Sequence, residues 1–171
     1  IRSQNAVFDK PTDKFDLRDN VEIVTVEDNQ PTTIHSATAV YEQTNGKIAL
    51  SGGADITQGG NFVKGDNINA QLYPTKKLQT AIVIGNAYLK QVTPEKTTEI
   101  TGNELNANFN NADKIQNAVA KGNAYLKQTT ADQISEVRGS EMNAGFDSNG
   151  IIQNANTIGQ SSVVLVPKES K

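Results

Sequence analysis

The heptapeptide Gly85-Asn-Ala-Tyr-Leu-Lys-Gln91 returns unchanged as Gly122–Gln128, and this repetition decides the fold of the chain. It belongs to two consecutive blocks of 37 residues, 63–99 and 100–136, which are identical at 15 positions without a gap. Self-similarity at a fixed period is the signature of a repeat architecture. Weaker copies lie on both sides of the pair. The sequence therefore predicts about five units, starting near Ile1, Ile34, Val63, Ile100 and Val137.

Each unit contains a stretch in which apolar and polar residues alternate. Three, five and seven residues after Gly65 stand Ile68, Ala70 and Leu72, with polar residues between them. A period of two is typical of a β-strand with one apolar face. The same positions recur in the other units as Leu105, Ala107, Phe109, Met142, Ala144, Phe146, Ala6, Phe8, Ala39 and Tyr41.

A second pattern surrounds the glycines Gly52, Gly85, Gly122 and Gly159. The residues two and four positions away on either side of these glycines are nearly all apolar. We expect each glycine to mark a tight bend between two strands that keep the same apolar face. Each unit then consists of strand, turn, strand, kink and strand, and the fold class is all-β.

Composition excludes several classes of function. The 171 residues carry a formal net charge of −3, which argues against nucleic acid as a partner. No apolar run approaches the roughly 20 residues of a spanning helix. The chain has no cysteine, and its single histidine, His35, falls at an outward position. We predict no catalytic residues, no metal site, no cofactor and no enzymatic activity. Because Ile1 is not an initiator methionine, we expect a processed product whose signal peptide has been removed.

The repeated apolar faces must be covered, and the pattern leaves two arrangements open. Two sheets can close on each other as a plain sandwich core. They can also stay splayed and leave an apolar groove that takes acyl chains, since burying a methylene contributes about 0.8 kcal/mol. A structural β-solenoid or adhesin segment is an alternative of another class, because glycine-punctuated repeats also suit parallel β-helices.

Three segments carry a resemblance to a known family. Gly85–Gln91, Gly52–Gly59 and the ending Val163–Pro167 resemble elements of the LptA/OstA family of lipopolysaccharide transport proteins. The resemblance implies one domain over residues 1–171, a twisted and slightly open β-jelly roll of two antiparallel sheets. The chain departs from the family pattern in its additional Ile1–Thr33 unit and in the close duplication of 63–99 at 100–136.

The resemblance also implies a function and a set of partners. The expected protein is a periplasmic, lipopolysaccharide-binding bridge between an inner-membrane ABC transporter and the outer-membrane translocon. Its partners would be the lipid A acyl chains, LptC-like and LptD-like jelly-roll domains, and further copies of itself joined end to end through Ser162–Val166. An LptC-like partner of the same pathway, tethered to the inner membrane, is the alternative within the family.

The inward strand positions are the candidate ligand-binding residues. We hypothesise that they line the groove, with the alternative that part of them form a plain core. The set comprises Phe8, Tyr41, Ile68, Ala70, Leu72, Leu89, Leu105, Ala107, Phe109, Leu126, Met142 and Phe146.

Overall fold

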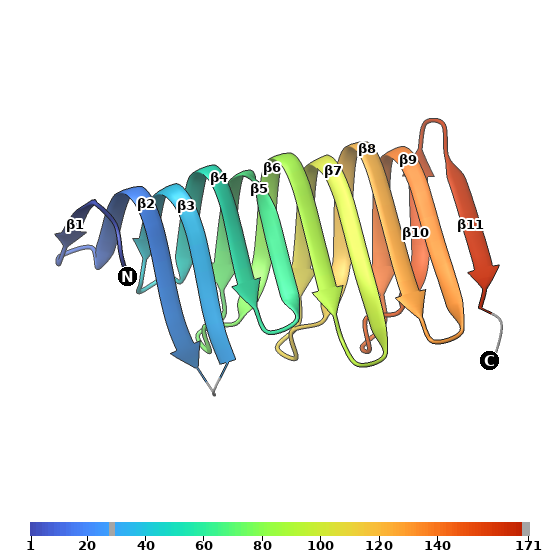
Figure 1. Cartoon of the computed structure of the whole chain (residues 1–171), viewed down its shortest axis with the longest axis horizontal. Helices are drawn as coiled ribbons and strands as arrows, with labels where there is room; N and C mark the ends of the chain where they lie inside the picture. Colours follow the sequence, from blue (N-terminus) through green and yellow to red (C-terminus); the bar gives the residue numbers. More distant parts are fainter. Residues whose placement is uncertain (28–29, 169–171) are drawn as a thin grey trace.

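The computed structural model describes residues 1–27 and 30–168, and within them every regular element is a β-strand. Eleven strands follow one another along the chain, joined by short turns (Figure 1). Their bounds are β1 Asn5–Asp9, β2 Lys14–Glu27, β3 Gln30–Glu42, β4 Lys47–Gln58, β5 Asn61–Leu72, β6 Leu78–Val92, β7 Lys96–Phe109, β8 Ile115–Thr130, β9 Gln133–Phe146, β10 Ile152–Ile158 and β11 Ser162–Pro167. The all-β prediction is confirmed.

The strands form one continuous ladder in which each strand from β1 to β10 pairs with the next along the chain. Every neighbouring pair is antiparallel. This register excludes the parallel β-helix. The ribbon turns over at the top of the view in Figure 1, so that each long strand contributes one half to a front layer and the other half to a back layer. The two sheets of the predicted jelly roll are thus two layers of one folded sheet.

The bends line up across the strands and form what we call the crease. It consists of the register interruptions near residues 19–20, 36–37, 52–53, 65–66, 85–86, 102–103, 122–123 and 139–140. Gly85 and Asn86 have φ of 78° and 50°, and Gly122 and Asn123 repeat this with 70° and 57°. Such paired left-handed residues make a bulge that bends the strand. The predicted bend at the glycines is confirmed. At Gly52, Gly85 and Gly122 it lies within one strand, whereas Gly159 separates β10 from β11 as predicted.

Two layers result from the crease. Layer A contains β1, β10 and the strand halves next to the turns at residues 10–13, 43–46, 73–77, 110–114 and 147–151. Layer B contains β11 and the other strand halves. The last two strands show the division, because β10 pairs with residues 141–146 of β9 and β11 pairs with residues 133–138 of the same strand.

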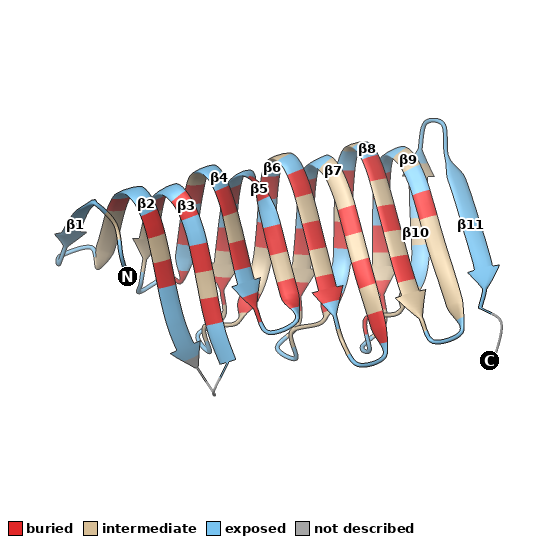
Figure 2. Ribbon diagram, viewed as in Figure 1, coloured by how far each residue is buried: buried red, intermediate tan, exposed pale blue. Residues whose placement is uncertain are grey.

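The core fills the space between the layers. Buried and exposed residues alternate along the strands, as the banding in Figure 2 shows. The buried set is apolar almost throughout and extends from Leu17 in β2 to Phe146 in β9. Burial falls at both ends of the sheet, where β1 and β11 are exposed along their whole length.

Replacing Gly122 with alanine tests the crease. A Cβ at this position would stand 2.6 Å from Nδ2 of Asn103, and the backbone would keep its φ of 70°. We expect Gly122→Ala to lower the free energy of unfolding by about 2–3 kcal/mol, since steric conflict adds to left-handed strain. Urea denaturation measures the change. Gly53→Ala is the control, because Gly53 has φ of 75° but no atom within 4 Å of its added Cβ. Equal losses in the two variants would contradict the packed crease.

Candidate functional site

The interior between the layers is a wedge whose side chains are graded in size. Small residues such as Ala87 and Ala124 stand beside the crease, and large aliphatic residues such as Leu89 and Leu126 follow two positions further on. In layer A, Phe109 lies at the far rim of the wedge and is 1% exposed. The grading gives the layers room to diverge from the crease while the space between them stays filled.

The structure brings most of the predicted groove residues together in this wedge. Ten of the twelve are 9% exposed or less: Ile68, Ala70, Leu72, Leu89, Leu105, Ala107, Phe109, Leu126, Met142 and Phe146. Tyr41 is half-buried and packs against the core from its edge. Phe8 is 50% exposed and lies outside the wedge on β1. Contact between these residues and a ligand stays a prediction.

A polar row closes the wedge on the side opposite the crease. Its first member is Gln58, near the end of β4 in layer B. The Gln58 amide donates to Oγ1 of Thr32 at 2.6 Å and to the backbone carbonyl of Lys76, in the β5–β6 turn of layer A, at 2.9 Å. Its Oε1 accepts from the backbone N–H of Leu78 at 2.8 Å. One buried amide therefore fastens layer B to layer A.

Gln128 repeats this arrangement four strands further along the sheet, near the end of β8. Its amide donates to Oγ1 of Thr98 and to the carbonyl of Gly150, both at 2.9 Å. Its Oε1 accepts from the N–H of Ile152 at 3.1 Å. The contacts match those of Gln58 atom by atom.

Gln91 holds the middle position of the row, in β6. Its amide donates to Oδ1 of Asn61 and to the carbonyl of Asp113, both at 2.7 Å. Within the described part of the chain, its Oε1 is buried and has no hydrogen-bond partner. We refer to Gln58, Gln91 and Gln128 together as the glutamine seam.

The backbone of layer A is shaped to meet the seam. The carbonyls that accept from the glutamines belong to Lys76, Asp113 and Gly150, whose φ values are 60°, 60° and 74°. The left-handed conformation ends each turn and directs that carbonyl toward layer B. Lys96 adds a further link, since its ammonium group donates to the carbonyl of Asn149 at 2.8 Å. Lys96 is 4% exposed, and this burial lowers the pKa of its side chain.

Both ends of the interior lack a seam glutamine. At the position six residues after the crease, β4, β6 and β8 carry the seam glutamines. At one end of the sheet, Thr25 in β2 occupies this position, and at the other end Leu165 in β11 occupies it. A cavity of about 270 Å³ lies at the first end, lined by Thr25, Ile23, Ile34 and Tyr41 among others. We call this cavity the N-terminal mouth.

Further lining surrounds the N-terminal mouth and its counterpart at the other end. Phe15 contributes to the N-terminal mouth, and the ring of Phe8 stacks on the ring of Phe15 with their centroids 4.5 Å apart. A cavity of about 320 Å³, the C-terminal mouth, lies at the other end beside Leu165 and Ile152. The interior thus has a mainly apolar opening at its N-terminal end, an opening with a mixed polar and apolar lining at its C-terminal end, and a polar closure between them.

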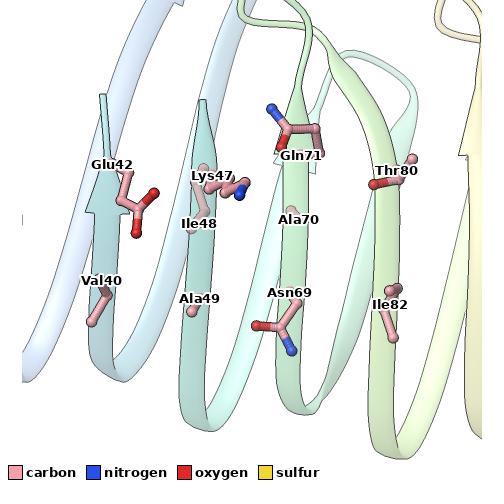
Figure 3. A pocket seen from close by; sticks show the side chains of 10 residues that line it. All are labelled: Val40, Glu42, Lys47, Ile48, Ala49, Asn69, Ala70, Gln71, Thr80 and Ile82. Carbon is pink, nitrogen blue, oxygen red and sulfur yellow. The ribbon is translucent and has the colours of Figure 1, made fainter. Parts of the chain in front are cut away.

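A separate hollow of about 290 Å³ lies on the outer surface of layer A (Figure 3). The small side chain of Ala49 on β4 forms part of its lining, between Val40 on β3 and Asn69 on β5. Glu42 and Lys47 supply opposite charges at its border. Of the predicted groove residues, only Ala70 borders this hollow. Its lining mixes polar and apolar groups.

Charged groups lie mainly on the outer faces. His35 is exposed, as predicted, and its Nδ1 lies 3.1 Å from Oδ1 of Asp55. On layer B, desolvation and a hydrogen bond to Glu99 raise the pKa of Tyr88 to about 12. Within residues 1–27 and 30–168, no group of three or more histidine and acidic side chains is placed to hold a metal ion. The same residues contain no helix long and apolar enough to cross a membrane.

Sequence reasoning missed the glutamine seam. The apolar residues two and four positions after each glycine, such as Leu89 and Leu126, define the inward phase, and Gln91 and Gln128 continue it two residues later. A glutamine that recurs at an inward position of an apolar strand is itself a signal, since buried amides require defined hydrogen-bond partners. Those partners come from turns distant in the sequence, so the pattern could show the position but not the contact.

The fold and its interior define a class: an all-β jelly roll made by one antiparallel sheet folded along a crease, with an apolar interior open at its ends. No family model matches the sequence, and no curated protein is significantly similar to it. The chain is similar in structure to LptH from Pseudomonas aeruginosa, described as the LptA-homologous periplasmic component of the conserved lipopolysaccharide transport device. The TM-score is 0.57 at 15% identity, over 85% of this chain and 100% of that one. The LptA-like fold predicted from the sequence is thereby confirmed.

Proposed function

We propose that this chain is a non-enzymatic periplasmic carrier that holds the acyl chains of lipopolysaccharide between its layers and passes the lipid along its length. The observation that carries the proposal is the apolar cluster between the layers, which extends from β2 to β9 and has a cavity at each end. The shared fold with a periplasmic lipopolysaccharide transport component supports the same assignment.

The N-terminal mouth suits an amphipathic ligand. Ile23 and Ile34 provide an apolar surface, and each methylene buried there contributes about 0.8 kcal/mol. Lys76 lies at the same mouth, so an anionic head group can meet a cation while the acyl chain enters the interior. These are the two features of lipid A that the site must recognise, its acyl chains and its phosphates.

End-to-end contact would continue the interior from one domain to the next. Val163 and Leu165 of β11 are each 60% exposed and lie in the row of inward positions. Among the described residues, β11 pairs with β9 alone, so its other edge is available for β-augmentation. A second copy, or an LptC-like or LptD-like jelly-roll domain, would cover this edge and align the mouths. Such heterologous contacts do not close into rings.

Photocrosslinking tests the proposal. We would place p-benzoylphenylalanine at Tyr41, which lines the N-terminal mouth, and irradiate the protein with purified lipopolysaccharide. Glu42 is the matched control, because the next residue along β3 points to the outer face. We expect a lipid adduct at position 41 and little or none at position 42. No adduct at position 41, or equal adducts at both positions, would overturn the proposed function.

A further inference from the structure

We propose that the glutamine seam is releasable, and that acyl chains enter the interior sideways when layer A and layer B separate there. This inference rests on the proposed function. It assigns Gln58, Gln91 and Gln128 the role of positioning residues that control access to the interior. Opening would begin at Gln91 and leave the crease intact.

Bonds of different kinds close the two sides of the wedge. At the crease, the layers are joined by the covalent strands themselves, which run from one layer into the other. On the opposite side, side-chain hydrogen bonds from Gln58, Gln91, Gln128 and their neighbours join layer B to turn carbonyls of layer A. Water can replace such bonds one for one when the layers part. The seam is therefore the side that opens while the strand ladder stays paired.

In the middle of the seam, Gln91 makes fewer hydrogen bonds than Gln58 and Gln128. Gln58 and Gln128 each accept a backbone N–H from layer A, but Oε1 of Gln91 has no partner among the described residues. Oδ1 of Asp113, the residue whose backbone carbonyl accepts from Gln91, is also buried and has no partner in the described part of the chain. Buried polar atoms without hydrogen bonds destabilise the closed arrangement. Opening hydrates both atoms, which favours separation at Gln91 first.

The closed interior is full. Leu89 and Leu126 are 0% exposed, and Phe109 is 1% exposed, so the middle of the wedge has no room for a further chain. The mouths hold about 270 and 320 Å³, enough for part of a lipid with several acyl chains but not for passage between the ends. Transfer along the interior therefore requires the layers to move apart, and the seam is where they can.

A chemical lock across the seam tests the inference. Glu95, in the β6–β7 turn, and Lys114, just before β8, are close enough for their charges to interact. The native chain has no cysteine, so Glu95→Cys/Lys114→Cys can be joined specifically by a short bismaleimide. The control pair is Asn108→Cys/Asn117→Cys, which links two strands of the same layer on the outer face, where the native side chains are 2.6 Å apart.

The readout is the loading of fluorescently labelled lipopolysaccharide, followed by stopped-flow fluorescence before and after the bismaleimide reaction. We expect the lock across the seam to slow loading by about tenfold or more, as for a blocked gating step, and the control lock to leave it unchanged. Equal loading rates in the two locked proteins would overturn the inference and leave the proposed function standing, with ligand entering through the mouths. Failure of the unmodified protein to load lipopolysaccharide would overturn both.

Discussion

Phe109→Ala is expected to lower the free energy of unfolding by about 3–5 kcal/mol, the range for truncating a buried phenylalanine. Phe109 is 1% exposed and stands at the rim of layer A, in register with Ile115 of the next strand. Removing the ring opens a cavity that the surrounding strands cannot fill, because their ladder bonds hold the backbone in place. Equilibrium denaturation in urea measures the loss, and the m-value should stay constant.

Two comparisons make this result specific. Asn108→Ala changes the outward neighbour of Phe109 and should cost less than about 0.5 kcal/mol, as for other surface positions. A saturated ten-carbon fatty acid that fills the cavity in Phe109→Ala should restore part of the lost free energy of unfolding. At a concentration about 100 times its dissociation constant, it should return about 2.7 kcal/mol. If Phe109→Ala without ligand lowers the free energy of unfolding by less than about 1 kcal/mol, the closed packing at this rim is contradicted.

The repeat pattern was sufficient to predict which residues face inward. Ile68 and Leu105 lie at equivalent positions of two units, and both are buried between the layers. Gly85 and Gly122 were predicted as bends, and both adopt left-handed backbone in the crease. These features are local, since strand alternation and glycine conformation depend on neighbouring residues along the chain.

Features that depend on distant contacts were beyond the pattern. The period of two does not show that the two halves of β6 belong to one ladder, so the pattern could not reveal that the two predicted antiparallel sheets are layers of one folded sheet. Gln91 gains its role from Asp113, 22 residues away. Phe8 shares the inward phase of Tyr41, but β1 pairs on one side only, and its ring is half-exposed at the edge of the sheet. Burial at the ends of a repeat depends on whether a neighbouring unit covers them.

The crease and the glutamine seam have different mechanical roles: the crease fixes the bend between the layers, and the seam holds the layers together on the opposite side. At the crease, left-handed residues such as Asn86 and Asn123 fix the bend, and Asn86 donates to both carboxylate oxygens of Asp66 at 3.2 Å. At the seam, isolated amides bridge gaps that no strand spans. A hinge of covalent strands opposite an edge of exchangeable hydrogen bonds is the arrangement that lets two packed layers open without unfolding.

Leu165→Lys is expected to weaken end-to-end association of this chain by about 100-fold. Leu165 is 60% exposed in β11, and its side chain occupies the inward row at the C-terminal mouth. Burying the Leu165 side chain under a second copy contributes about 1.5–3 kcal/mol to the free energy of association. A lysine at this position removes this contribution and adds the cost of desolvating its ammonium group. An inward-pointing charge on an edge strand is also a known barrier to strand pairing.

Sedimentation velocity over a range of protein concentrations measures this change. The unaltered chain should form species that grow with concentration, because head-to-tail contacts add without closing. Leu165→Lys should stay monomeric at concentrations where the unaltered chain has assembled. Ile82→Lys is the control, since Ile82 is 43% exposed on the outer face of layer A, away from both ends of the sheet. If Leu165→Lys and Ile82→Lys assemble alike, β11 is not the contact. If the unaltered chain stays monomeric at millimolar concentration, the carrier works as a single domain, and its ligand passes between mouths that meet only transiently.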